Sequence, residues 1–90
     1  MGYDSKYGKV VTEHGDIPDD EPVIVCRARD LCTVAMLGYY REVCRLSGSS
    51  PFHLGLVMKV MSEFAAWQGE HPDRTRVPDS EAHRQRLTGE

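Results

Sequence analysis

The chain lacks the sequence patterns that carry most enzyme chemistry. It has no Gly-rich phosphate loop, and no nucleophile stands in a recognisable arrangement with a base. The histidines are His14, His53, His71 and His83, and no two of them have the i, i+4 spacing that places two zinc ligands on one helix. These absences predict a non-enzymatic protein that needs neither a metal ion nor another cofactor.

The chain is also poor in cysteine, and its cysteines form no C-x-x-C pair. An odd number argues against a disulfide framework. We therefore expect Cys26, Cys32 and Cys44 to be small, mostly buried apolar residues in a reducing compartment. Cys26 is the candidate for reactivity, because Arg27 and Arg29 follow it.

Long hydrophobic runs and an excess of basic residues are missing as well. No apolar run approaches the roughly 20 residues that a membrane span needs. The N-terminal residues do not form a basic and then apolar signal segment. The net charge is −3, which gives no general argument for nucleic-acid binding. The C-terminal basic residues alternate with acidic ones: Arg74, Arg76, Arg84 and Arg86 with Asp73, Asp79 and Glu81. We expect a cytoplasmic protein without membrane or nucleic-acid partners.

The clearest signal that is present is the segment Gly48–Pro51, between the apolar-rich runs Leu31–Leu46 and Phe52–Trp67. Glycine is common just past a helix end, serine is a good N-cap, and proline is favoured at the first helical position. The sequence therefore predicts one helix that begins near Asp30 or Thr33 and ends at about Ser47, and a second that begins at about Pro51. A connection this short makes the two helices antiparallel.

Both predicted helices carry apolar stripes wider than one partner helix covers. We expect these stripes to meet the sheet, a second copy of the chain, or both, which predicts a homodimer or higher oligomer. Gly38 and Gly55 lie inside the helices at a cost of about 1 kcal/mol each, so close backbone approach is expected within the hairpin or across a dimer. Gly69 and Pro72 are expected to end the second helix.

Two short strands are predicted before the helices, after a loose tail at residues 1–6. Tyr7–Thr12 is the first, and Val23–Ala28, a β-branched run that follows Pro22, is the second. They are expected to pair antiparallel, with Ile24, Cys26 and Ala28 facing the helices. The predicted fold is α+β: a two-stranded antiparallel sheet followed by an antiparallel helical hairpin (ββαα). Residues 1–71 form the single domain, and residues 72–90 form a polar tail, mobile or ordered by a partner, with a candidate short helix at Glu81–Leu87.

The acidic loop at residues 13–21 is a candidate site for a hard cation. Its spacing does not match an EF-hand, so a solvated turn is the favoured interpretation. Its acids are Glu13, Asp16, Asp19, Asp20 and Glu21.

The one cluster that indicates ligand binding joins Arg27 and Arg29 to Tyr39, Tyr40 and Arg41 on the first helix. Arginine recognises phosphate or carboxylate, tyrosine offers an aromatic face, and a helix N-terminus favours anions. The candidate ligand-binding residues are Arg27, Arg29, Tyr40 and Arg41. The alternative is that the two arginines pair with the acidic loop and that Tyr40 belongs to the core.

The leading hypothesis for function is a non-enzymatic, oligomeric binding protein for a small anionic ligand, such as a nucleotide signal. The alternative is a protein-interaction module, or a small regulatory or inhibitor protein, that docks through its apolar helical face and charged tail.

The segments Tyr7–Lys9, Gly15–Val23 and Arg27–Asp30 make the first third of the chain similar to a group of small actinobacterial and phage proteins of unassigned function. In outline, a short sheet followed by a helical hairpin also resembles phage sponge proteins, which sequester cyclic-nucleotide immune signals as oligomers. This second resemblance implies an anti-defence role through nucleotide binding, and it transfers no individual site residue.

Overall fold

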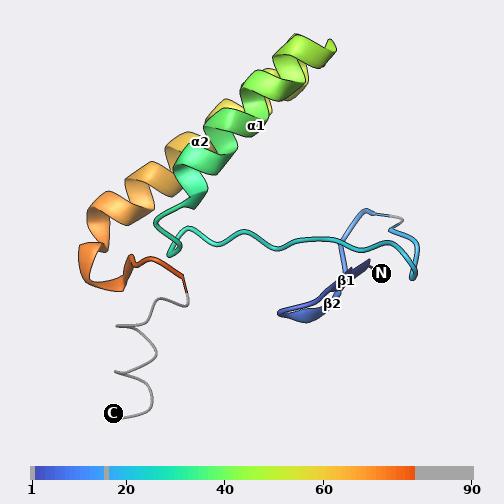
Figure 1. The fold of residues 1–90 in the computed structure, drawn as a ribbon, viewed down its shortest axis with the longest axis horizontal. Coiled ribbons are helices and arrows are strands. Elements are labelled where there is room, and N and C mark those ends of the chain that lie inside the picture. Colours follow the sequence, from blue (N-terminus) through green and yellow to red (C-terminus); the bar gives the residue numbers. More distant parts are fainter. Residues whose placement is uncertain (1, 16, 79–90) are drawn as a thin grey trace.

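The computed structural model describes residues 2–15 and 17–78 of the chain. Its elements, in order, are strands β1 (Gly2–Asp4) and β2 (Gly8–Val10), helices α1 (Thr33–Ser47) and α2 (Pro51–Glu70), and a 3₁₀ turn η1 (Pro72–Arg74). Figure 1 shows the two helices side by side as a long hairpin, with the strands joined to it by an extended linker. The predicted ββαα fold is confirmed.

The connection between the helices has the local structure that its residues predict. Gly48 closes α1 with a left-handed φ of 93°, and the N–H of Ser49 donates to the Cys44 carbonyl at 2.9 Å. Ser50 caps α2, because its Oγ accepts from the His53 N–H at 3.2 Å, and Pro51 occupies the first turn. The helix boundaries predicted at this connection are therefore confirmed.

One of the two predicted strands is present, but its partner is not the predicted one: β2 lies within the predicted strand Tyr7–Thr12. Residues 2–4 were expected to be a loose tail, but they pair antiparallel with β2, in the register Gly2↔Val10 and Asp4↔Gly8. The predicted strand at 23–28 is wrong: the segment is an extended linker, joined to β1 by a bridge between Tyr3 and Pro22. A tight turn at 5–7 brings β1 to β2 at a lower loop-closure cost than the longer connection between the predicted strands at 7–12 and 23–28.

The apolar core described by the structure is small. Cys44 and Val57 are the buried apolar residues among residues 2–15 and 17–78, and both lie on the helical hairpin. Neither strand packs against α1 or α2, so the expectation that the sheet covers the helices is wrong. Ile24, which was expected to face the helices, is exposed. Much of the hairpin's apolar surface therefore lies open in the single chain.

The segment after α2 returns to the linker. The helix ends at Glu70, one residue beyond the predicted Gly69, and Pro72 begins η1. The Arg76 N–H donates to the Arg29 carbonyl at 2.9 Å, and its carbonyl accepts from the Leu31 N–H at 2.9 Å. Residues 72–78 are thereby joined to the linker, whereas the rest of the predicted tail, including the predicted helix Glu81–Leu87, lies outside the described residues.

The two helix-interior glycines do not show the expected close approach within the hairpin. A Cβ on Gly38 would lie 3.4 Å from the flexible Cε of Met61, which is an ordinary contact. A Cβ on Gly55 would meet no atom within 4 Å. Packing inside the hairpin therefore does not require glycine at either position.

Candidate anion-binding site

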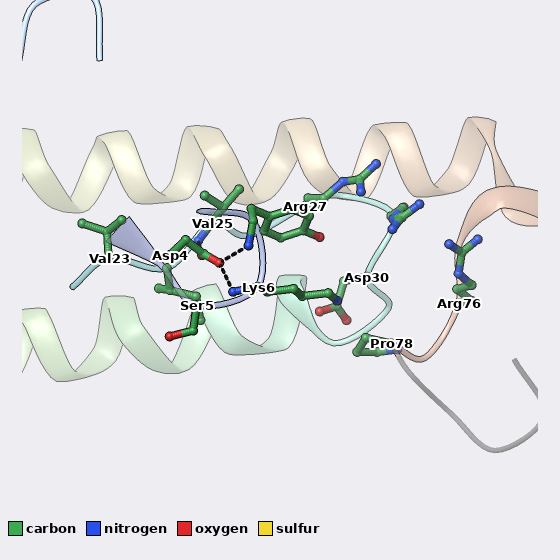
Figure 2. Close-up of a pocket in the computed structure, with 12 residues that line it drawn as sticks. Asp4, Ser5, Lys6, Val23, Val25, Arg27, Asp30, Arg76 and Pro78 are labelled. Carbon is green, nitrogen blue, oxygen red and sulfur yellow. Dashed lines mark hydrogen bonds between the residues drawn. The ribbon is translucent and has the colours of Figure 1, made fainter. Parts of the chain in front are cut away.

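The linker and the C-terminal segment form a basic pocket with the N-terminal turn (Figure 2). The pocket has a volume of about 700 Å³. Its charged lining residues are Lys6, Arg27, Arg29 and Arg76 on the basic side, and Asp4 and Asp30 on the acidic side. Three segments that are far apart in the sequence therefore contribute charge to one cavity.

Asp4 is the residue that organises the N-terminal side of this pocket. It is buried, and its Oδ1 accepts hydrogen bonds from the backbone N–H groups of Lys6 and Tyr7, both at 2.8 Å. Its Oδ2 accepts from the Val25 N–H at 2.6 Å. Hydrogen bonds from Tyr7 and Val25, followed by Lys6, hold the pKa of Asp4 below its ordinary value. Three N–H donors thus partly offset the cost of burying the charge of this carboxylate.

Asp30 is engaged where the linker meets α1. Its Oδ1 accepts from the Cys32 N–H at 2.8 Å. Its backbone carbonyl accepts from the Thr33 hydroxyl at 2.8 Å and from the Gln68 side-chain amide at 3.1 Å. The same amide donates to the Ala28 carbonyl at 2.9 Å. These bonds hold the linker that carries Arg27 and Arg29 against the end of α2.

The basic side chains of the pocket are not neutralised by nearby acids. Within residues 2–15 and 17–78, no carboxylate lies within ion-pair distance of Lys6, Arg27, Arg29 or Arg76. The predicted alternative, in which Arg27 and Arg29 pair with the acidic loop, is therefore not seen among the described acids of that loop. A cluster of cations that lacks described partners attracts an anion.

Tyr7 adds an aromatic surface between two of these cations. The Arg27 guanidinium lies 5.8 Å from the centre of the Tyr7 ring, and the Lys6 ammonium lies 5.5 Å from it. A side-chain hydrogen bond with Arg27 is the main reason that the pKa of the Tyr7 phenol lies below its ordinary value. An anion that binds the guanidinium of Arg27 would therefore compete with the Tyr7 hydroxyl for the N–H donors of Arg27.

A second, smaller pocket of about 390 Å³ adjoins the first and shares Arg27, Arg29 and Arg76 with it. Phe64 and Trp67 of α2 form its aromatic part. The Trp67 ring stacks on His71 at 4.4 Å between centroids, and the Arg74 guanidinium lies 5.0 Å from it. The shared arginines thus stand between an open polar cavity and an aromatic one.

The structure separates the predicted cluster of ligand-binding residues. Arg27 and Arg29 line the pockets, but Tyr40 and Arg41 line neither. The Arg41 Nε donates to the Leu54 carbonyl at 3.2 Å, and Tyr40 meets His53 in an edge-on ring contact. Both residues lie two turns into α1, about 11 Å from its start. Tyr40 is also not a core residue, because 47% of it is exposed.

Sequence reasoning missed Lys6, Tyr7 and Arg76 as residues of the pocket. The local signal at the N-terminus is an aspartate followed by Ser5 and later by Gly8, a pattern that favours an Asx-type turn. No comparable signal marks Arg76, because its neighbour Arg29 is distant in the sequence. Only the return of the chain after α2 brings the two together.

The cysteines differ in part from the expectation. Cys44 is buried as predicted, Cys26 is half-buried, and Cys32 is exposed, so the expected burial is wrong for Cys32. Burial, with the charges of Asp30 and Asp4, raises the pKa of the Cys26 thiol. This direction opposes the reactivity that Arg27 and Arg29 suggested.

The described acids of the loop at residues 13–21 do not form a cation site. Glu21 closes a turn by donating its N–H to the Pro18 carbonyl at 3.1 Å, and Glu13, Asp20 and Glu21 are exposed. Asp16 lies outside the described residues. In the described ranges, no three His, Cys, Asp or Glu side chains form a group that could hold a metal ion.

The comparisons with known proteins give no match: no family model, curated protein or solved structure is similar to this chain. The resemblances drawn from the sequence therefore stay predictions. None of the helices in the described part of the chain is long and apolar enough to cross a membrane. The two adjoining pockets, with the arginines they share, are therefore the features that indicate a function.

Proposed function

We propose that this protein is a non-enzymatic binding protein for a small ligand with at least two negative charges, of the nucleotide class. The observation that carries the proposal is the pocket lined by Lys6, Arg27, Arg29 and Arg76. Within the described ranges these cations have no carboxylate partner, and both aspartates of the pocket accept backbone hydrogen bonds.

The adjoining aromatic pocket supports a nucleotide rather than an inorganic anion. Guanidinium groups bind phosphate oxygens through paired N–H donors. Phe64 and Trp67, next to the shared arginines, offer apolar surface for a base or another ring. A ligand with a phosphate at one end and a ring at the other matches the two adjoining environments.

Isothermal titration calorimetry of the full chain with AMP, ADP and pyrophosphate tests the proposal. We expect ADP to bind most tightly, because it alone combines two phosphates with a ring. The double variant Arg27→Ala, Arg29→Ala should weaken ADP binding by at least about 100-fold, since it removes two charged hydrogen bonds that cost about 1.5–3 kcal/mol each. Arg76→Ala should weaken it in the same direction.

The matched control is Arg41→Ala, which removes a guanidinium that lines neither pocket. It should leave ADP affinity unchanged. Affinity that is unaffected in the Arg27, Arg29 double variant would show that the site is wrong. Absence of binding by all three probes would contradict the proposed ligand class.

A second candidate function, a protein-interaction module or small inhibitor, is favoured by the exposed apolar side chains of the hairpin, among them Leu46 and Phe52. In this case the charged C-terminal tail contributes to docking. A pull-down with the full chain and with a chain that ends at Pro78 tests it. Loss of a captured partner in the shortened chain, with capture retained by Arg76→Ala, would favour this function.

A further inference from the structure

An apolar face lies open at the end of the helical hairpin where the two helices are connected. Its residues, with their exposed fractions, are Tyr40 (47%), Val43 (43%) and Leu46 (72%) on α1, and Phe52 (83%) and Leu56 (48%) on α2. We call this set the distal face. Monomeric proteins rarely expose a contiguous apolar patch of more than a few hundred Å².

One contact joins the two helices within this set of exposed side chains. Tyr40 of α1 meets His53 of α2, with ring centroids 6.0 Å apart and planes at 79°. Val43 and Leu46 follow Tyr40 at successive three-residue steps, each of which turns the stripe by about 60° around the end of α1. Phe52 and Leu56 are four residues apart on α2, so they are neighbours on its surface, to the same side of His53. The Tyr40–His53 contact thus joins a stripe on each helix into one surface.

The linker covers part of the other end of the hairpin. The Cys26 Sγ lies 3.9 Å from the Met36 Sδ, and residues 26–29 line a pocket together with Phe64 and Trp67. The linker therefore protects the part of the hairpin near the start of α1 and the end of α2. Figure 1 shows the opposite, connecting end projecting beyond the other described segments. Neither strand contacts α1 or α2.

The area of the distal face matches what one protomer contributes to a stable dimer. A whole large side chain has about 150–200 Å² of surface, so the exposed fractions of the five residues of the distal face amount to roughly 500 Å² of apolar surface. A standard interface takes about 800 Å² from each partner, of which about 65% is apolar in homodimers. The face therefore supplies about the apolar area that such an interface needs.

The charge of the hairpin permits a second copy as the partner. Residues 33–70 contain three basic and three acidic residues: Arg41, Arg45 and Lys59, and Glu42, Glu63 and Glu70. Arg45 already forms an ion pair with Glu42. A balanced surface does not repel an identical copy and does not select a partner of opposite charge.

We propose that the distal face is the interface of a homodimer, in which two hairpins pack about a two-fold axis as a four-helix bundle. Each copy presents the same patch, as an isologous interface requires. The inference does not depend on the ligand proposed above. The interface lies at the far end of the hairpin from the arginine pocket, so ligand binding and dimerisation can fail separately.

Sedimentation velocity on the full chain, over a wide range of protein concentration, tests this inference. We expect twice the chain mass of 10.2 kDa. The double variant Val43→Glu, Leu56→Glu should raise the concentration needed for association by at least about 100-fold. In the dimer, two negative charges from each copy would be buried at the interface, facing the same two charges of the other copy. Val11→Glu is the matched control: it places the same charge on an exposed apolar residue outside the hairpin, and it should stay dimeric.

A second variant distinguishes loss of the dimer from loss of the fold. Phe52→Lys changes a side chain that is mostly exposed in the single chain, so the hairpin should keep its helical circular dichroism while the dimer dissociates. For the unmodified chain, the unfolding midpoint should rise with protein concentration. A folded monomer at every concentration, a trimer or larger assembly, or a helical Phe52→Lys variant that remains a dimer would each overturn the proposal.

Discussion

The carboxylate of Asp4 accepts a hydrogen bond from the backbone N–H of Val25 at 2.6 Å. This bond joins the N-terminal turn to the linker that carries Arg27 and Arg29. The other oxygen of Asp4 closes the turn itself, through the N–H groups of Lys6 and Tyr7. A single ionised side chain therefore supports one wall of the basic pocket.

The attachment of the N-terminal turn should weaken in acid. The pKa of Asp4 in the folded chain is below its ordinary value of 3.8. Its contribution to stability is therefore fully present above that ordinary value and is lost as the pH falls through the folded pKa. Hydrogen exchange at the Val25 amide should show protection that declines below about pH 4. Asp4→Asn should lower this protection at neutral pH and remove its pH dependence, whereas Asp20→Asn, at an exposed site, should change neither.

Replacement by alanine should change the free energy of unfolding in opposite directions at Gly48 and Gly55. Gly48 has a φ of 93°, so Gly48→Ala should lower the free energy of unfolding by about 1–2 kcal/mol. Gly55 lies inside α2 with no atom within 4 Å of an added Cβ, so Gly55→Ala should raise it by about 0.5–1 kcal/mol. Urea unfolding at one fixed protein concentration measures both. Destabilisation by Gly55→Ala would mean that another surface packs against this position.

Gln68 should link the stability of the chain to its ligand affinity. Its side-chain amide donates to the carbonyls of Ala28 and Asp30, which flank the arginine-bearing part of the linker. Gln68→Ala should cost about 1–3 kcal/mol of unfolding free energy, for two hydrogen bonds at about 0.5–1.5 kcal/mol each. It should also weaken ADP binding. Gln68→Glu keeps the shape but replaces the donor with a carboxylate, so it should be at least as damaging; equal stability of Gln68→Glu and the unmodified chain would contradict this role.

The phenol of Tyr7 should report on the occupancy of the pocket. Its pKa lies below the ordinary value chiefly because of its side-chain hydrogen bond with Arg27. Arg27→Ala should therefore raise the pKa of Tyr7, as measured by the phenolate absorbance that is lost in Tyr7→Phe. An anion bound to Arg27 should raise it in the same direction. A Tyr7 titration that is insensitive to both changes would place the phenol outside the site.

The candidate site was predictable only in part. Arg27 and Arg29 were identified because they follow an apolar run and precede a helix, and the structure places both in the pockets. Tyr40 and Arg41 were grouped with them from proximity in the sequence. The rise of the helix carries these two residues toward the distal face, where Arg41 binds the Leu54 carbonyl.

The sequence by itself determined the helical hairpin, down to the residues at which one helix ends and the next begins. Gly48, Ser50 and Pro51 act through φ angles and hydrogen bonds that span only a few residues, so their effect does not depend on the rest of the fold. Tertiary structure decided which segment pairs with β2 and which cations meet in the pocket. These outcomes depend on competition between contacts that are distant in the sequence. Asp4 can reach Val25, and Arg76 can reach Arg29, only after the linker and the end of α2 have been placed.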